Sequence, residues 1–254
     1  MLSLFPPPAG PFLPPFSSLF VQGSYHQSSI IYLAIGHVLQ SSKHEALVIS
    51  SSPAKFKQKL SSAFNESSSG FLNTNKIKTA MLRIIVIYPP SPAHLSLLIS
   101  TLDGTQFASE LTCLWAGLPV SPTENLSLII LDDISASFSE IDRNPPALSF
   151  ISMMNRLRQT ISRITTARAS ANPISVACFE ASLFERQSHL EGVTRELFQL
   201  IIQFREVEVL SDPAGEKQTR KRISTWNGDE HTSIEYIERL TPGGAKVEYE
   251  FLWE

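Results

Sequence analysis

A glycine-containing segment between an apolar strand and an apolar helix is the first place where this sequence could bind a charged ligand. At such a position the pattern GxxxxGK[ST] forms a phosphate-binding loop: backbone N–H groups surround the phosphates, the lysine contacts their oxygens, and the hydroxyl holds Mg²⁺. With Gly23 as the first glycine, Ser28 replaces the second glycine, Ser29 the lysine and Ile30 the Ser/Thr. The segment therefore predicts a degenerate Walker A turn that lacks both its cation and its magnesium-binding hydroxyl.

A carboxylate at the end of a second apolar strand is the other candidate ligand. The run LSLIILD has the form of a Walker B motif, in which Asp132 would organise Mg²⁺ and its water. Aspartate at a strand end is also common in turns and helix caps, and this alternative stays open. The adjacent Asp133 is expected to point to the opposite side of the extended chain, which argues against an acid/base pair.

The elements that must position these residues are strands alternating with helices. Strands are expected at 18–21, 46–49, 82–88, 126–131 and 174–177. Helices are expected at 30–39, around 56–64, from Ser91-Pro92 onward and at 147–168, with a loop at 65–75. The alternation predicts an α/β fold of three layers with a mostly parallel sheet. A β-rich end, at 200–210, 219–226 and 245–253, predicts an antiparallel C-terminal extension of that sheet.

Composition limits the classes of protein to which the chain can belong. Its 254 residues, 43% hydrophobic and 18% charged, are enough for a substantial core. A net charge of −3 and a pI near 6.1 mean that nucleic-acid binding would need a local basic patch. Cys113 and Cys178 belong to no CxxC or Cys/His cluster, which favours a reducing intracellular compartment. No apolar run reaches the roughly 18 residues of a membrane span, so no membrane partner is expected.

The amino terminus is unusual because it is rich in proline and aromatic residues and has no charged side chain. Residues 1–15 predict an apolar, extended arm that precedes a domain at 16–254. The lack of a basic residue and the many prolines argue against a secretory signal. A docking arm and a disordered leader are both compatible with this composition. The aromatic residues proposed to bind a partner are Phe5, Phe12, Phe16 and Phe20.

Two basic clusters are candidates for DNA contacts. Arg156 and Arg163 lie seven residues apart on the helix at 147–168, and therefore on one face. Arg220, Lys221 and Arg222 form a second cluster in the β-rich end. If both clusters faced the same way, they could hold single-stranded DNA without reading its sequence. The competing interpretation is that both are merely solvated charged surfaces.

Several segments together resemble the RecA superfamily, and within it the recombinase paralogues. They are VQGSYHQSSIIYLAIGHVL as a decayed P-loop and helix, EALVISSSPAKFKQKL as the second strand and helix, and LSLIILDDI as Walker B. The resemblance places Ser52 where relatives carry the glutamate that activates the attacking water. The segment LRIIVIYPPSPAHLSLLIS further resembles the small RecA-like subunit of Shu-type complexes, whose partner is a SWIM-domain protein.

The resemblance implies a RecA-like domain that assists homologous recombination and DNA repair in the nucleus through a protein complex. Its partners would be a SWIM-domain protein or other RecA paralogues, with single-stranded DNA bound through the complex. The cofactor that the family implies is ATP with Mg²⁺, but loss of the lysine and the glutamate predicts a non-catalytic or weakly catalytic subunit. Two alternatives stay open: a subunit of an Elongator-type tRNA-modification assembly, and a true ATPase with an atypical P-loop lysine at Lys43 or Lys55.

Overall fold

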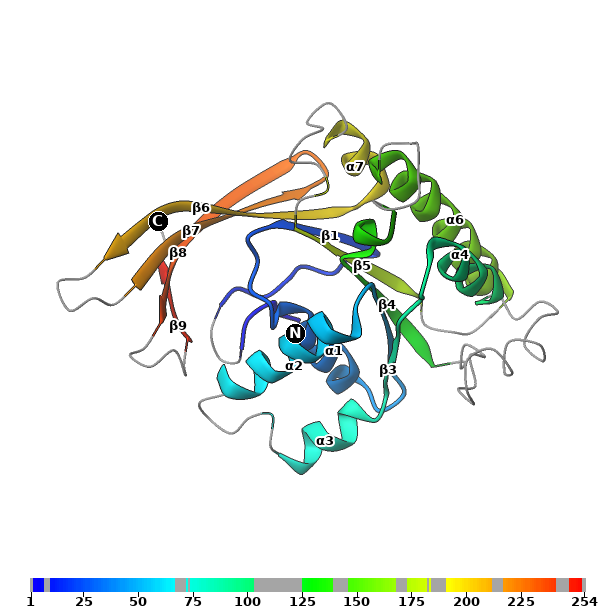
Figure 1. The fold of residues 1–254 in the computed structure, drawn as a ribbon, viewed down its shortest axis with the longest axis horizontal. Helices are drawn as coiled ribbons and strands as arrows, with labels where there is room; N and C mark the ends of the chain where they lie inside the picture. Colours follow the sequence, from blue (N-terminus) through cyan, green and yellow to red (C-terminus); the bar gives the residue numbers. More distant parts are fainter. Residues whose placement is uncertain are drawn as a thin grey trace.

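A single mixed sheet organises the protein. The computed structural model describes residues 2–6, 10–66, 72, 74–102, 125–138, 146–167, 173–181, 183, 191–211, 217–240 and 247–252. Within these residues, nine strands form one sheet in the order β3-β2-β4-β5-β1-β6-β7-β8-β9 (Figure 1). The strands are β1 Ser18–Gly23, β2 Glu45–Ser50, β3 Ile84–Ile87, β4 Leu126–Asp132, β5 Ser175–Glu180, β6 Leu200–Ser211, β7 Lys217–Asn227, β8 Glu230–Leu240 and β9 Val247–Leu252.

The sheet has a parallel half and an antiparallel half. The six strands from β3 to β6 pair in parallel, and β7, β8 and β9 add antiparallel to β6. All seven residues of β4 are buried, as expected for a parallel strand that is covered on both faces. The prediction of an α/β fold with a mostly parallel sheet and an antiparallel C-terminal extension is therefore confirmed.

Helices cover both faces of the parallel half (Figure 1). They are α1 Ser29–Gln40, α2 Pro53–Glu66, α3 Asn75–Met81, α4 Pro92–Thr101, the 3-10 helix η2 Ile134–Phe138, α6 Pro146–Ala167 and α7 Glu191–Leu197. One hydrophobic core lies between the sheet and α1, α2 and α3, and a second lies between the sheet and α4, α6 and η2. None of the described helices is long and apolar enough to cross a membrane.

The predicted helix at Ser91-Pro92 shows how local sequence determines an element boundary. The Ser91 side chain accepts a hydrogen bond from the backbone N–H of His94 at 3.4 Å, and Pro92 occupies the first turn. The helix predicted at 147–168 is α6, with Met153, Leu157 and Ile164 buried along one face. Position 168 lies outside the described residues.

Four of the described elements, α3, η2, α7 and β8, were not expected from the sequence. Strand β8 was missed because its many charged residues obscure the alternation that buries Tyr236 on one face. Helix α3 begins at Asn75, where the predicted loop ends, and α2 continues to Glu66 inside the range predicted as loop. Cys178 is a buried free thiol in β5, and Cys113 lies outside the described residues.

The amino-terminal arm packs against its own chain. Ser3 and Phe12 form an antiparallel bridge, and the Leu13 N–H donates to the Leu2 carbonyl at 2.8 Å. Phe5 is only 2% exposed, and its ring meets Tyr236 edge-on at 5.4 Å. Of the four aromatic residues proposed to bind a partner, Phe5 and Phe20 are buried in the two cores, Phe16 is partly buried, and Phe12 is 61% exposed.

Candidate functional site

The carboxyl ends of β1, β5, β4 and β2 are neighbours along one edge of the sheet. Strand β1 leads into α1 on one face, whereas α7, which follows the adjacent β5, packs near the core on the other face. Open α/β sheets bind ligands outside the carboxyl ends of their strands where the connections diverge in this way. This edge holds Gly23, Ser28, Ser29 and Asp132, so the structure brings all four predicted nucleotide-site residues to the same part of the molecule.

Gly23 ends β1 in a conformation that requires glycine. Its φ is +86°, and a Cβ atom placed on it would lie 2.0 Å from the Phe204 carbonyl oxygen in β6. The backbone N–H of Gly23 donates to the Ala181 carbonyl at 3.2 Å, and that of Ser24 donates to the Phe204 carbonyl at the same distance. Close packing of β1 against β6 therefore accounts for this glycine without a phosphate.

The side chains of the loop that follows Gly23 and of the start of α1 contact or are buried among other residues of the protein. Ser28 Oγ lies 2.6 Å from His26 Nδ1, and Ser28 caps α1 without a side-chain hydrogen bond to the helix. Ser29 is fully buried, and its hydroxyl has no hydrogen-bond partner. Ile30 is also fully buried, in the core beneath α1. The position that carries lysine in a P-loop thus holds a buried, neutral side chain.

Asp132 is held by a lysine that sequence reasoning missed. Its Oδ1 lies 2.5 Å from Lys59 Nζ, and its Oδ2 accepts a hydrogen bond from Ser50 Oγ at 2.8 Å. The side chains of Asp132 and Lys59 are 1% and 11% exposed, so the ion pair is largely shielded from water. The spacing of Lys55 and Lys59, one helical turn apart on the helix after β2, was the available signal.

Asp133 faces the same helix as Asp132, which corrects the expectation that the two carboxylates point to opposite sides. The extended chain ends at Asp132, and Asp133 adopts a φ of +53°. This turn brings Asp133 Oδ2 to 2.8 Å from Lys55 Nζ, whose side chain is 58% exposed. The hydrogen bond to Asp133 raises the pKa of Lys55 above its usual value. Lys55 and Lys59 of α2 are therefore both paired with carboxylates at the end of β4.

Glu180, at the end of β5, is a third carboxylate at this edge and was not predicted. It is 1% exposed, and burial raises its pKa to about 8. Ser135 opposes that increase by donating its backbone N–H to Oε1 at 2.9 Å and its hydroxyl to Oε2 at 2.5 Å. Burial also raises the pKa of the nearby Tyr25 phenol well above its usual value, as do the Asp132 and Glu180 charges. The run CFE resembles LSLIILD in ending an apolar strand with an acid, and that similarity could have identified Glu180.

Lys221, predicted to contact DNA, instead binds the loop after β1. Its Nζ lies 2.7 Å from Glu238 Oε2 and 3.2 Å from the Ser24 carbonyl, and the residue is 7% exposed. Glu238 also lies 3.8 Å from His26 Nε2. The net effect of burial is to lower the pKa of His26, although Glu238 acts in the opposite direction. Strands β7 and β8 of the extension therefore stabilise the loop after β1, through Lys221 and Glu238.

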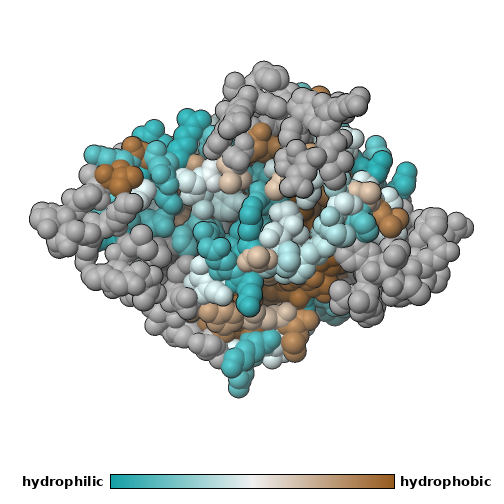
Figure 2. Space-filling view, in the orientation of Figure 1, coloured by the Kyte–Doolittle hydropathy of each residue, from teal (hydrophilic) through white to brown (hydrophobic). Residues whose placement is uncertain are grey.

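The other predicted DNA contacts lie on separate surfaces. Arg220 and Arg222 both pair with Glu235, at 2.6 Å from Arg220 Nε and 2.6 Å from Arg222 Nη2. Alternation along β7 puts these two arginines on the face opposite Lys221. Arg156 and Arg163 are exposed on α6, away from the beginning of β7 (Figure 1). The surface in Figure 2 shows hydrophilic and hydrophobic patches interspersed rather than one continuous area of either kind.

The residues at this edge do not fit a magnesium nucleotide. Ile30 has no hydroxyl, Ser28 and Ser29 have no positive charge, and the Lys59 ammonium occupies the contact on Asp132 that a metal ion would use. Lys43 precedes β2 and lies at the opposite edge of the sheet. Within the described residues, no group of three His, Cys, Asp or Glu side chains has the geometry of a metal site.

The sequence matches no protein-family model and none of the curated proteins with which it was compared. The motifs and the geometry of this edge therefore carry what can be inferred about function.

Proposed function

We propose that this protein is a RecA-like subunit that does not turn over nucleotide and that assists homologous recombination through a protein complex in the nucleus. Its partner would be a SWIM-domain protein or another RecA paralogue. The observation that carries the non-catalytic part is the buried ion pair between Lys59 and Asp132. The recombination part depends on the motif resemblance described above.

The arrangement of the sheet supports a RecA-like, P-loop-type origin. The loop after β1 and the aspartate after β4 lie at one edge of a parallel sheet, as a Walker A turn and a Walker B aspartate must to share a nucleotide. Helix α1 starts directly after the loop, in the order strand, loop, helix that a P-loop requires.

The ion pair argues against phosphoryl transfer. That reaction depends on positioning and on positive charge at the phosphates, supplied by a lysine and a metal ion. Here Lys221 beside the loop and Lys59 beside the strand end are each paired with an internal carboxylate. Each missing electrostatic group typically costs about 10²–10³ in rate. The atypical ATPase with Lys55 is disfavoured because Lys55 is paired with Asp133.

Nucleotide assays on the purified chain test the non-catalytic part. We expect no ATP hydrolysis above buffer and no magnesium-dependent binding of a fluorescent ATP analogue. The matched variants Lys59→Ala and Lys55→Ala should leave hydrolysis equally absent. Turnover by the wild type that Lys55→Ala abolishes would establish the atypical ATPase instead.

Affinity purification of the tagged chain, with mass spectrometry, tests the choice of complex. A SWIM-domain protein or recombinase paralogues among the recovered proteins would support the proposal. Recovery of tRNA-modification subunits would favour the Elongator-type alternative and reject the recombination role.

A further inference from the structure

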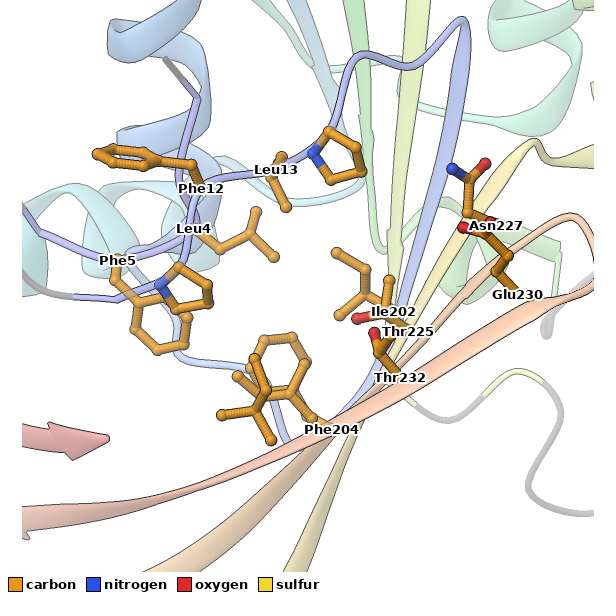
Figure 3. Close-up of a pocket in the computed structure, with 14 residues that line it drawn as sticks. Leu4, Phe5, Phe12, Leu13, Ile202, Phe204, Thr225, Asn227, Glu230 and Thr232 are labelled. Carbon is orange, nitrogen blue, oxygen red and sulfur yellow. The ribbon is translucent and has the colours of Figure 1, made fainter. Parts of the chain in front are cut away.

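A groove opens between the amino-terminal arm and the inner face of the antiparallel extension (Figure 3). Its volume is about 240 Å³, and arm residues form one wall while β6, β7 and β8 form the other. Its lining includes Leu4 and Leu13 of the arm, Ile202 and Phe204 of β6, and Glu230 and Thr232 of β8.

The groove is apolar at one end and polar at the other. Figure 3 shows Leu4 and Leu13 extending from the arm toward Ile202, while Glu230 and Asn227 lie together at the far end. Leu4 and Phe204 are each 2% exposed and form a fixed floor, whereas Glu230 and Thr232 at the rim are exposed. The apolar side chains that a ligand can reach are the partly exposed Leu13 and Ile234, which also line the groove.

Its size favours a side chain over a whole small molecule. Sites for drug-sized ligands usually have about 300–1,000 Å³, which exceeds this groove. One or two apolar side chains of a binding partner would fill it, as anchor residues fill central pockets in protein interfaces.

The negative charge at the rim of the groove indicates which residue of the partner should lie next to its apolar anchor side chain. Glu230 is the charged residue among those that line the groove, and the adjacent Asp229 is also exposed and acidic. A lysine or arginine next to the anchor would meet these carboxylates, and complementary rim charges raise association rate and specificity.

We propose that this groove binds a short extended segment of a partner protein, in which a large apolar side chain is followed by a basic residue. The proposal rests on the proposed function, since it assigns the surface through which a non-catalytic subunit holds its partner. The apolar side chain packs against Leu13 and Ile234, and the basic side chain pairs with Glu230.

The test uses the full chain and fluorescein-labelled peptides of the form Gly-Ser-X-Lys-Arg-Ser-Gly, where X is Leu, Met, Phe or Trp. Fluorescence anisotropy gives the affinity, and isotope-labelled isoleucine methyl groups locate the site by NMR. We expect the signals of Ile202, Ile223 and Ile234 to shift and that of Ile129, in the other core, to stay unchanged. Replacing X by Ala should weaken binding by about 10- to 100-fold.

Three exposed positions provide the variants. Thr232→Trp fills the groove and should abolish binding, whereas Ser233→Trp, exposed on the opposite face of β8, should leave it intact. Glu230→Lys should reverse the preference toward peptides in which Glu-Glu replaces Lys-Arg.

Absence of methyl shifts with every apolar-basic peptide, or equal binding by Thr232→Trp and Ser233→Trp, would overturn the proposal. Self-association that sedimentation detects in the wild type and that Thr232→Trp removes would assign the groove to a second copy of the chain instead. None of these measurements uses nucleotide, so a failure here is distinguishable from the discovery of ATP turnover.

Discussion

At the residue scale, Lys59 is the side chain whose removal should be most informative. Lys59→Met leaves the Asp132 carboxylate buried without its cation, which should lower the free energy of unfolding by about 3–5 kcal/mol. Urea denaturation followed by circular dichroism measures this loss.

Lys55→Met is the matched control, because Lys55 lies one turn away and its side chain is 58% exposed. Exposed ion pairs contribute at most about 1 kcal/mol. Adding Asp132→Leu to Lys59→Met should recover most of the stability, since a buried ion pair can be replaced by apolar groups at little cost. Equal losses for Lys59→Met and Lys55→Met would show that the Asp132 pair is not buried as described.

Glu180 should make stability depend on pH. In the folded protein its pKa is about 8, whereas an unfolded glutamate titrates near about 4.3. Between these values the unfolded chain binds fewer protons than the folded one, so the free energy of unfolding falls as pH rises. Glu180→Gln cannot titrate, so the wild type should lose about 2–5 kcal/mol relative to this variant from pH 4.5 to 8.

Urea midpoints of both proteins across that range measure the difference. If the urea midpoints of wild type and Glu180→Gln change in parallel with pH, Glu180 has an ordinary glutamate pKa in the folded protein. Such a result would indicate that the carboxyl reaches water.

At the element scale, the junction between β1 and β6 depends on Gly23. Gly23→Ala puts a methyl group 2.0 Å from the Phe204 carbonyl at a φ of +86°, so the two strands must separate. We expect a loss of more than about 3 kcal/mol, beyond the usual effect of a positive φ.

Gly228→Ala is its control, because Gly228 also has a positive φ, +61°, but nothing lies within 4 Å of its added Cβ. Its cost should be about 1 kcal/mol. A Gly23→Ala protein as stable as Gly228→Ala would contradict the close approach of β1 to β6.

The elements also show where sequence reasoning succeeds. Strands β2 and β4 were predicted to within one residue at each end, because fully buried strands are uninterrupted apolar runs. Helix α3 has only seven residues, too few to show a helical period, although Thr74 accepts a hydrogen bond from the Ile77 N–H as an N-cap. Strand β8 follows Asn227-Gly228, a recognised hairpin signal that could have revealed it.

The candidate site was also predictable only where its residues belong to a local sequence pattern. Its strand-end residues, Gly23 and Asp132, belong to local patterns and were found. The lysines that contact these segments were not found in those roles, because Lys59 is 73 residues from Asp132 in sequence and Lys221 is 197 residues from Ser24. Pairings at such separations depend on strand order, which no local pattern determines.

At the scale of the whole molecule, the antiparallel extension and the parallel half share one core. Tyr236 of β8 and Ile223 of β7 belong to the same buried cluster as α1 and the arm residue Phe5. Lys221 further ties β7 to the loop after β1. Loss of the extension would therefore expose the core beneath α1, so neither half should unfold alone.

This predicts a single cooperative unfolding transition. Trp226 reports on the extension, where it packs against the second core near Arg195. In a variant carrying Trp115→Phe and Trp253→Phe, urea midpoints from Trp226 fluorescence and from circular dichroism should coincide, as two-state unfolding requires. An earlier fluorescence transition would show that β7–β9 form a separate unit, and the domain predicted at 16–254 would then have to be divided. A coincident transition would mean that a partner bound between the arm and the extension stabilises the whole protein, including the edge that carries Asp132.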